Sequence, residues 1–280
     1  MSTETATIGE VFSLAWQQYK QRALPILAVL LISSAIVGGL VMIMVLCGMF
    51  GGAILTHFID ERTALLFVII VVVLLLLVVT VLAVWCQAAL LAIIVDDELG
   101  IIEAFRTGWD FLWPMAWIMT IWGGIMITGF LCAILPGILF MVWFSFCFYT
   151  MIAEDRRGLD SLLASMEYVR GHWWDTFVKL LLVWLLSVLL SVIPFVGQIL
   201  SILFAPYFML FMLIMYRDLK EIKGEVVITA GSGTRIFWWV LAVIGLLLPI
   251  LGLAGALVTL LSGDQTWLEY SHQSVKQTWL

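Results

Sequence analysis

The feature that most constrains this chain is the length of its stretches without a charged residue. Leu65 to Val95 are 31 consecutive positions with no Asp, Glu, Lys or Arg. An α-helix needs roughly 20 residues to cross the hydrocarbon layer of a bilayer, which is about 30 Å thick. Backbone polar groups in lipid must be satisfied within a helix or a closed barrel, and this stretch lacks the alternating pattern of a barrel strand. It therefore predicts a transmembrane helix.

The whole chain shares this character. It is 64% hydrophobic and only 11% charged, which is more apolar surface than a soluble domain can bury. The sequence thus predicts an all-α polytopic membrane helix bundle of about seven transmembrane helices. The predicted spans are Leu24–Cys47, Leu65–Val95, Met115–Leu135, Ile138–Ala153, Trp174–Ile193, Gly197–Tyr216 and Ile236–Leu261.

The orientation follows from the basic residues, because Lys and Arg accumulate in cytoplasmic loops. With the N-terminus in the cytoplasm, eleven of the thirteen lie inside, and only Arg62 and Lys276 lie outside. The outer turns are then His57–Arg62, Pro136–Gly137 and Pro194–Gly197, and a tail from Ser262 is extracytoplasmic. The acidic N-terminal residues lack the basic start of a cleaved signal peptide. We expect a multi-pass protein of the bacterial cytoplasmic (inner) membrane.

No pattern in the sequence indicates catalysis, a metal ion or a cofactor. The four cysteines show no CxxC spacing, and the three histidines are isolated in three different loops. No nucleophile, zinc or phosphate-binding motif is present. The acidic residues near the span ends, among them Asp96, Asp97, Glu98 and Glu154, are interpreted as solvated loop ends. With a net charge of −6, no nucleic-acid partner is expected.

An internal repeat organises the chain. Residues 8–16 (IGEVFSLAW) match residues 101–109 (IIEAFRTGW), and a looser copy occupies residues 159–166 (LDSLLASM). In each copy an acidic residue is followed by an apolar one two positions later, a small one five later and a large one six later. The domain prediction is therefore a repeat-built membrane domain over 1–223, with an interfacial helix and a transmembrane hairpin three times. Residues 224–280 add a further transmembrane helix and the tail.

Each repeated segment has apolar residues at helical spacing, which predicts three interfacial amphipathic helices. The acidic residue near each N-terminus is favourably placed against the helix dipole. Phe12, Phe105 and Leu162 occupy the equivalent position on the expected buried side.

Several further motifs carry a family resemblance. They are Leu135-Pro136-Gly137-Ile138-Leu139, Glu154 at a span end, residues 158–165 (GLDSLLAS), Gly171-His172-Trp173-Trp174, residues 193–197 (IPFVG) and Tyr216-Arg217-Asp218-Leu219. Over about residues 8–223 the chain resembles the membrane domain of bacterial glycerophosphoryl diester phosphodiesterases and its stand-alone relatives. Trp143 stands where the family pattern has an Arg, and the seventh span is additional. The catalytic domain of those enzymes is absent, so the resemblance implies a membrane bundle and no activity.

The mid-span positions hold no ionisable residue, whereas an ion-coupled carrier normally has one. Mid-span polar side chains are interpreted as helix packing contacts, Gly123-Gly124 are expected to loosen the third span, and Pro206 is expected to kink the sixth. Basic and aromatic residues instead mark the cytoplasmic span ends. The predicted lipid or partner surface comprises Lys20, Arg22, Arg106, Arg170, Lys179, Trp16, Trp109 and Trp173.

The sequence therefore favours a non-catalytic integral membrane protein that acts as a scaffold subunit or a lipid-interacting module. Its expected partners are membrane lipids, and a protein partner or a second copy of the chain. The alternative is a transporter or flippase of an amphiphilic substrate, and a third possibility is an intramembrane enzyme, for which no acid–base or metal constellation is visible.

Overall fold

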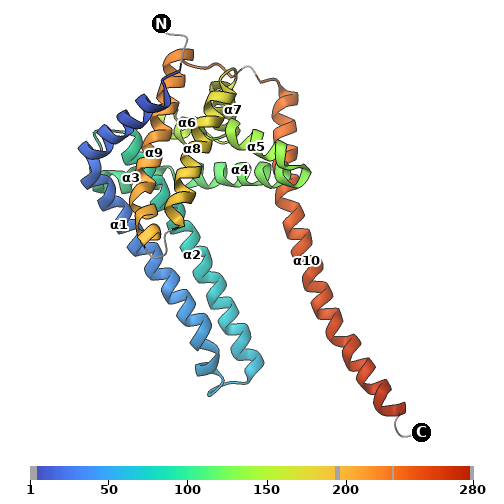
Figure 1. Ribbon diagram of the computed structural model, residues 1–280. Helices are drawn as coiled ribbons and strands as arrows, with labels where there is room; N and C mark the ends of the chain where they lie inside the picture. Colours follow the sequence, from blue (N-terminus) through green and yellow to red (C-terminus); the bar gives the residue numbers. More distant parts are fainter. Residues whose placement is uncertain (1–4, 193–195, 229, 278–280) are drawn as a thin grey trace. The chain divides into compact units, whose positions relative to one another are not determined.

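The computed structural model describes residues 5–192, 196–228 and 230–277, and all regular structure in these residues is α-helical (Figure 1). The helices are α1 (Ile8–Leu55), α2 (Glu61–Val95), α3 (Ile101–Asp110), α4 (Leu112–Cys132), α5 (Ile134–Trp143), α6 (Cys147–Glu154), α7 (Leu159–Val169), α8 (Trp173–Ser191), α9 (Val196–Lys223) and α10 (Ser232–Gln277).

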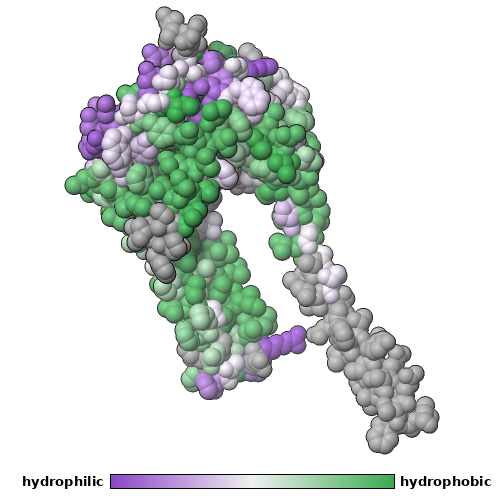
Figure 2. All heavy atoms as spheres, viewed as in Figure 1, coloured by the Kyte–Doolittle hydropathy of each residue, from purple (hydrophilic) through white to green (hydrophobic). Residues whose placement is uncertain are grey.

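Seven segments of the described residues are long and apolar enough to cross a membrane, as the sequence predicted. They are Ile8–Gly51, Arg62–Val95, Leu112–Cys132, Ile134–Glu154, Trp173–Ser191, Leu200–Lys223 and Ser232–Gly255. The α1–α2 hairpin carries hydrophobic residues along its surface, down to the polar turn that joins its two helices (Figure 2). The chain is thus an all-α, multi-pass membrane protein.

The described residues form two compact units. The first, here called unit 1, falls within residues 1–119 and 141–229, and the second, unit 2, falls within 120–140 and 230–280. Helix α4 passes from one unit into the other. The compact units therefore group part of the second repeat with the C-terminal helix. The sequence repeat, in contrast, predicted a domain boundary at residue 223.

All three repeated segments are helical. In α1 the segment is set off from the following span by a break at Arg22, whose backbone angles are φ −120° and ψ 16°. Pro25 explains this break, because its ring excludes the carbonyl four residues earlier and it has no N–H to donate. The other two segments are separate helices, α3 and α7.

Each segment buries the side that the sequence predicted. The ring of Phe12 lies 4.7 Å from that of Phe211, the ring of Phe105 lies 5.4 Å from that of Trp85, and Leu162 is fully buried. Each segment thus packs against the last span of the repeat before it, in a cycle: α3 on α2, α7 on α6 and the start of α1 on α9. Unit 1 is held together by this cycle of contacts.

The small and acidic positions of the repeat have distinct structural roles. A Cβ at Gly108 would lie 2.7 Å from the backbone nitrogen of Ala89, so only glycine permits this approach of α3 to α2. The carboxylate of Glu10 accepts a hydrogen bond from the Thr7 backbone N–H at 2.8 Å, and that of Glu103 accepts one from Gly100 at 3.1 Å. In the first two copies the acidic residue therefore caps its own helix.

The fourth predicted span is interrupted. It forms α5 and α6, separated at residues 144–146. Ser165 of α7 reaches this break, where its hydroxyl donates to the carbonyl of Trp143 at 2.8 Å and accepts from the N–H of Phe146 at 3.0 Å. A break at membrane depth is tolerated where protein groups satisfy the freed backbone. The predicted turn at Pro136–Gly137 was wrong, since both residues lie in α5 and the chain turns at Ala133.

In unit 2, α10 packs against the second half of α4. Thr128 donates its hydroxyl hydrogen to the carbonyl of Leu241 at 2.7 Å, and a Cβ at Gly124 would lie 3.0 Å from the Cα of Ala242. Gly124 is therefore a helix contact point and does not loosen α4, contrary to the expectation. Helix α10 continues to Gln277, beyond the predicted span end at Leu261. The predicted turn at Pro194 lies outside the described residues.

The two ends of α2 provide a test of the predicted orientation. At about 1.5 Å per residue, this helix of 35 residues separates them by about 52 Å. In a chain whose four native cysteines are replaced, Thr63→Cys at the outer end should react with a membrane-impermeant thiol reagent in intact cells. Glu225→Cys, which is also exposed but follows α9 on the predicted cytoplasmic side, where α2 also ends, should react only after lysis. Labelling of Glu225→Cys alone in intact cells would reverse the orientation.

The two adjacent glycines of α4 provide a matched pair. Gly124→Ala should destabilise the docking of α10 by roughly 1–3 kcal/mol, because the new methyl group meets backbone atoms that cannot move aside. Gly123 has open space around its Cα, so Gly123→Ala should be neutral or stabilise the helix by about 0.5–1 kcal/mol. Thermal unfolding in mild detergent measures both, and equal midpoints for the two variants would refute the tight α4–α10 contact.

Candidate functional site

The last spans of the three repeats, α2, α6 and α9, end in unit 1 with equivalent acidic residues. Asp96, Glu154 and Asp218 each stand 11 residues after an aromatic residue, namely Trp85, Trp143 and Tyr207. Two of the aromatic positions, Trp85 and Tyr207, are equivalent in space as well. Trp85 Nε1 donates to the carbonyl of Phe105 at 2.8 Å, and the Tyr207 hydroxyl donates to that of Phe12 at 3.3 Å. We call the region around these span ends the polar end of unit 1.

Glu154 is the most strongly bonded group of the polar end. Its Oε1 accepts hydrogen bonds from the hydroxyls of Tyr216 at 2.5 Å and Tyr168 at 2.7 Å, and lies 3.0 Å from Lys220 Nζ. Its Oε2 accepts one from Arg156 Nε at 2.6 Å. The side chain is only 8% exposed. The interpretation of Glu154 as a solvated loop end was therefore wrong.

This cluster joins three elements. Tyr168 comes from α7, Tyr216 and Lys220 come from α9, and Glu154 is the last residue of α6. Burial, with the hydrogen bond to the charged carboxylate of Glu154, raises the pKa of Tyr168 well above its ordinary value. The phenol therefore remains a donor at any physiological pH. Each bond satisfies a group that would be costly to bury alone, so the cluster fixes the three elements relative to one another.

Two arginines bind the C-terminal end of α2. Arg22, at the break in α1, donates through Nη1 to the carbonyls of Ile93 at 3.0 Å and Asp96 at 3.1 Å. Arg217 of α9 donates to the carbonyl of Val95 at 2.9 Å. Asp97 lies between them, at 3.2 Å from Arg22 and 3.7 Å from Arg217. Cations thus satisfy carbonyls that a helix end leaves without partners, and they face the negative end of its dipole.

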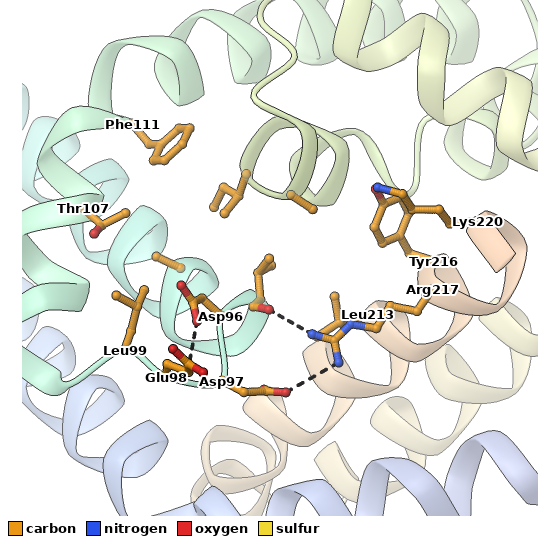
Figure 3. Close-up of a pocket in the computed structure, with 14 residues that line it drawn as sticks. Asp96, Asp97, Glu98, Leu99, Thr107, Phe111, Leu213, Tyr216, Arg217 and Lys220 are labelled. Atoms are coloured by element: carbon orange, nitrogen blue, oxygen red, sulfur yellow. Dashed lines mark hydrogen bonds and ion pairs between the residues drawn. The ribbon is translucent and has the colours of Figure 1, made fainter. Parts of the chain in front are cut away.

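A cavity of about 630 Å³ opens between these elements (Figure 3). One part of its wall is apolar and includes Ala92, Phe111, Ile152 and Leu213. The remainder carries charges of both signs. The acidic wall is the loop after α2, with Asp96, Asp97 and Glu98, and the basic wall is α9, with Arg217 and Lys220 beside Tyr216. A cavity of this size and mixed lining is typical of a small-molecule site.

The charges on the two walls are not equally compensated. Arg217 pairs with Asp97, and Lys220 pairs with Glu154 just outside the cavity. Asp96 Oδ1 accepts the backbone N–H of Glu98 at 2.9 Å. Within the part of the chain that the structure describes, neither Asp96 nor Glu98 forms an ion pair with a cation. The acidic wall therefore has carboxylate capacity left for a ligand.

The residues of the predicted lipid or partner surface do not form one patch. Trp16 and Lys20 pair on the first part of α1, with Lys20 Nζ 5.2 Å from the centre of the Trp16 ring. On α3, Arg106 and Trp109 are exposed. Near the start of α8, Trp173 stacks on Phe177 and is partly buried, while Arg170 is exposed beside Glu167. Each repeat thus carries its own basic and aromatic group.

The two remaining predicted residues do not lie on an exposed surface. Lys179 is only 2% exposed and bonds to Asp175 one helical turn away, at 2.6 Å. Arg22 has its guanidinium bonded to the end of α2, as described above. In the sequence both are basic residues near the end of a predicted span, which suggested exposure. In the structure both side chains face protein because neighbouring helices pack around them.

Sequence reasoning missed the cavity and the partners of Glu154. The constant distance between an aromatic and an acidic residue in the last span of each repeat was the available signal. It indicates that Asp96, Glu154 and Asp218 lie at one level. Nothing in the sequence indicates that two tyrosines and a lysine converge on only one of the three. No group of three or more His, Cys, Asp or Glu that could hold a metal ion occurs among the described residues.

The Glu154 cluster makes a stability prediction. Glu154→Gln keeps the shape but removes the charge, leaving Arg156 and Lys220 without their anion in a mostly buried place, so unfolding should become easier by about 3–5 kcal/mol. Asp155→Asn removes the neighbouring carboxylate, whose pair with Arg157 is exposed on both sides, and should change stability by less than about 1 kcal/mol. Thermal unfolding in detergent compares the two, and a Glu154→Gln variant as stable as Asp155→Asn would contradict the cluster's structural role.

The chain matches no protein-family model, no curated protein and no solved structure. Its likeness to the membrane domain of glycerophosphoryl diester phosphodiesterases therefore stays a prediction from the quoted motifs.

Proposed function

We propose that this protein is a non-catalytic membrane protein of the bacterial cytoplasmic membrane that binds lipids through the polar end of unit 1. The observation that carries the proposal is the exposure of a basic residue and a tryptophan close together on the first two repeated helices. Lys20 Nζ lies 5.2 Å from the centre of the Trp16 ring, and Arg106 and Trp109 are both exposed three residues apart on α3.

Such a pair matches the headgroup layer of a bilayer. A tryptophan ring is favourable where one edge is wet and the other apolar, and a nearby cation attracts anionic headgroups. Trp109 is 58% exposed, and Ile102 on the same helix is 85% exposed, although both are large apolar residues. Contact with lipid explains this exposure better than contact with water does.

The bonding of Glu154 supports a non-catalytic role. This mostly buried carboxylate has both oxygens engaged by protein donors, so neither is left to accept a proton from a substrate. A scaffold function uses the same surface, with an acidic partner protein in place of an anionic lipid.

The cavity supports a second candidate, a transporter or flippase of an amphiphile. It combines an apolar wall with charges of both signs at the ends of α2, α6 and α9. Transport would make substrate movement depend on the cavity residues, whereas lipid recruitment depends on the exposed pairs.

Neutralising the exposed basic residues should weaken binding of anionic lipid. Each cation near an anionic surface contributes on the order of 1 kcal/mol, so the triple variant Lys20→Gln, Arg106→Gln and Arg170→Gln should lose up to about 100-fold in affinity. Native mass spectrometry with phosphatidylglycerol measures the retained lipid.

A matched comparison strengthens this test. Arg106→Gln alone should lower lipid retention. Arg62→Gln should not, because Arg62 is also exposed but lies at the start of α2, away from the polar end. Thermal unfolding should be unchanged in both, because neither side chain is buried. Full lipid retention by the triple variant would sink the recruitment proposal and favour the transporter.

A further inference from the structure

We propose that the cavity at the polar end holds the headgroup of a zwitterionic phospholipid that carries a primary ammonium group, of the ethanolamine type. The ammonium group binds Asp96 and Glu98, and the phosphate lies toward Lys220. This inference rests on the proposed lipid-binding function and names the lipid class that this part of the protein selects.

The acidic wall specifies a cation. Asp96 and Glu98 line the cavity without a cationic partner among the described residues. Arg22 and Arg217 already occupy the C-terminal carbonyls of α2, so the two carboxylates, and not this helix end, attract the ligand. Ala153, at the C-terminal end of α6, lines the same cavity and brings a helix end of negative sign to it. An ammonium group is favoured there by two carboxylates and one helix terminus.

A metal ion does not fit this wall. Its carboxylates follow one another along a loop, and no group of three or more acidic, His or Cys side chains among the described residues converges to hold an ion. A Ca²⁺ ion takes six to eight oxygen ligands, more than the carboxylates of Asp96 and Glu98 provide. An ammonium group needs fewer partners, because it donates three hydrogen bonds.

The basic wall specifies the other half of the ligand. A purely anionic ligand would leave Asp96 and Glu98 in the same cavity without a cation, and Arg217 is already paired with Asp97, so such a ligand is disfavoured. A lysine ammonium has three donors, and the contact of Lys220 with Glu154 uses one. Lys220 is 32% exposed and lines the cavity, so its remaining donors are available to one phosphate without breaking that contact.

The apolar wall indicates that the headgroup is part of a lipid and is not a free small molecule. Phe111, Ile152 and Leu213 have no function toward a small charged molecule, but they suit the glycerol portion and first acyl carbons of a lipid. The volume of about 630 Å³ is in the range of sites that enclose a whole drug-sized ligand, so it has room for more than a headgroup.

The test compares lipid classes on the purified full chain. Native mass spectrometry with equimolar phosphatidylethanolamine and phosphatidylglycerol should show retained phosphatidylethanolamine on the parent protein. The double variant Asp96→Asn and Glu98→Gln should retain at least about tenfold less phosphatidylethanolamine, because a charge-assisted hydrogen bond is lost at each position. Asn at position 96 keeps an oxygen acceptor for the Glu98 N–H, so the loop is preserved.

The control removes the same charge elsewhere. Asp155→Asn with Glu225→Gln neutralises two exposed carboxylates of unit 1 outside the cavity and should leave phosphatidylethanolamine retention unchanged. A similar loss in both double variants would reduce the effect to net charge and overturn the proposal. So would equal retention by the parent protein and the Asp96/Glu98 variant.

Two further measurements distinguish failure of this proposal from failure of the proposed function. Phosphatidylglycerol retention should fall in the Lys20/Arg106/Arg170 variant and not in the Asp96/Glu98 variant. If phosphatidylglycerol retention falls in this way but neither the parent protein nor the Asp96/Glu98 variant binds phosphatidylethanolamine, the cavity proposal fails and the recruitment proposal stands. Soluble phosphoethanolamine should compete only at much higher concentration than the lipid. Equal potency of phosphoethanolamine and the lipid would assign the site to a free headgroup and overturn the proposal of a lipid ligand.

Discussion

The structure of unit 1 depends on one constraint, the need to satisfy backbone polar groups where a helix ends or breaks near a membrane. Two arginines from α1 and α9 bind the carbonyls at the end of α2. Ser165 of α7 bonds to both sides of the break between α5 and α6. The partner in each case comes from another helix. Satisfying local backbone groups therefore also joins the repeats to one another.

The residues of the repeat likewise combine local and interhelical roles. Glu10 and Glu103 cap their own helices, the apolar residue of each copy lies in an interface, and Gly108 permits close approach of α3 to α2. These three roles need only a short pattern, which is why a match of nine residues is enough to detect it. The positions between them are free to diverge, and that is where the polar end becomes asymmetric. Tyr168 and Lys220 surround Glu154, while the equivalent Asp96 faces a cavity.

The asymmetry is what suggests function. Three equivalent acidic residues with equivalent surroundings would form a structural motif alone. Here one is enclosed by donors, one accepts the N–H of Ala6, and one is left on a cavity wall with charges of both signs. In our proposals, the lipid surface around unit 1 and the headgroup in its cavity use different residues of the same end. The exposed basic residues would attract anionic lipids in general, and the cavity would add a preference for one headgroup class.

The sequence by itself determined the fold class, the seven spans and the three repeated helices, because each follows from uninterrupted apolar length or from helical spacing within a short window. It also placed Phe12, Phe105 and Leu162 on buried faces. The tertiary structure alone decided which polar residues meet. Glu154 lies 62 residues from Tyr216, and Arg22 lies 71 residues from the carbonyl it binds. Local patterns carry no information about such distances, so Arg22 and Lys179 were indistinguishable from surface cations. Only the packing of α8 and the break at Arg22 turn these two side chains toward protein.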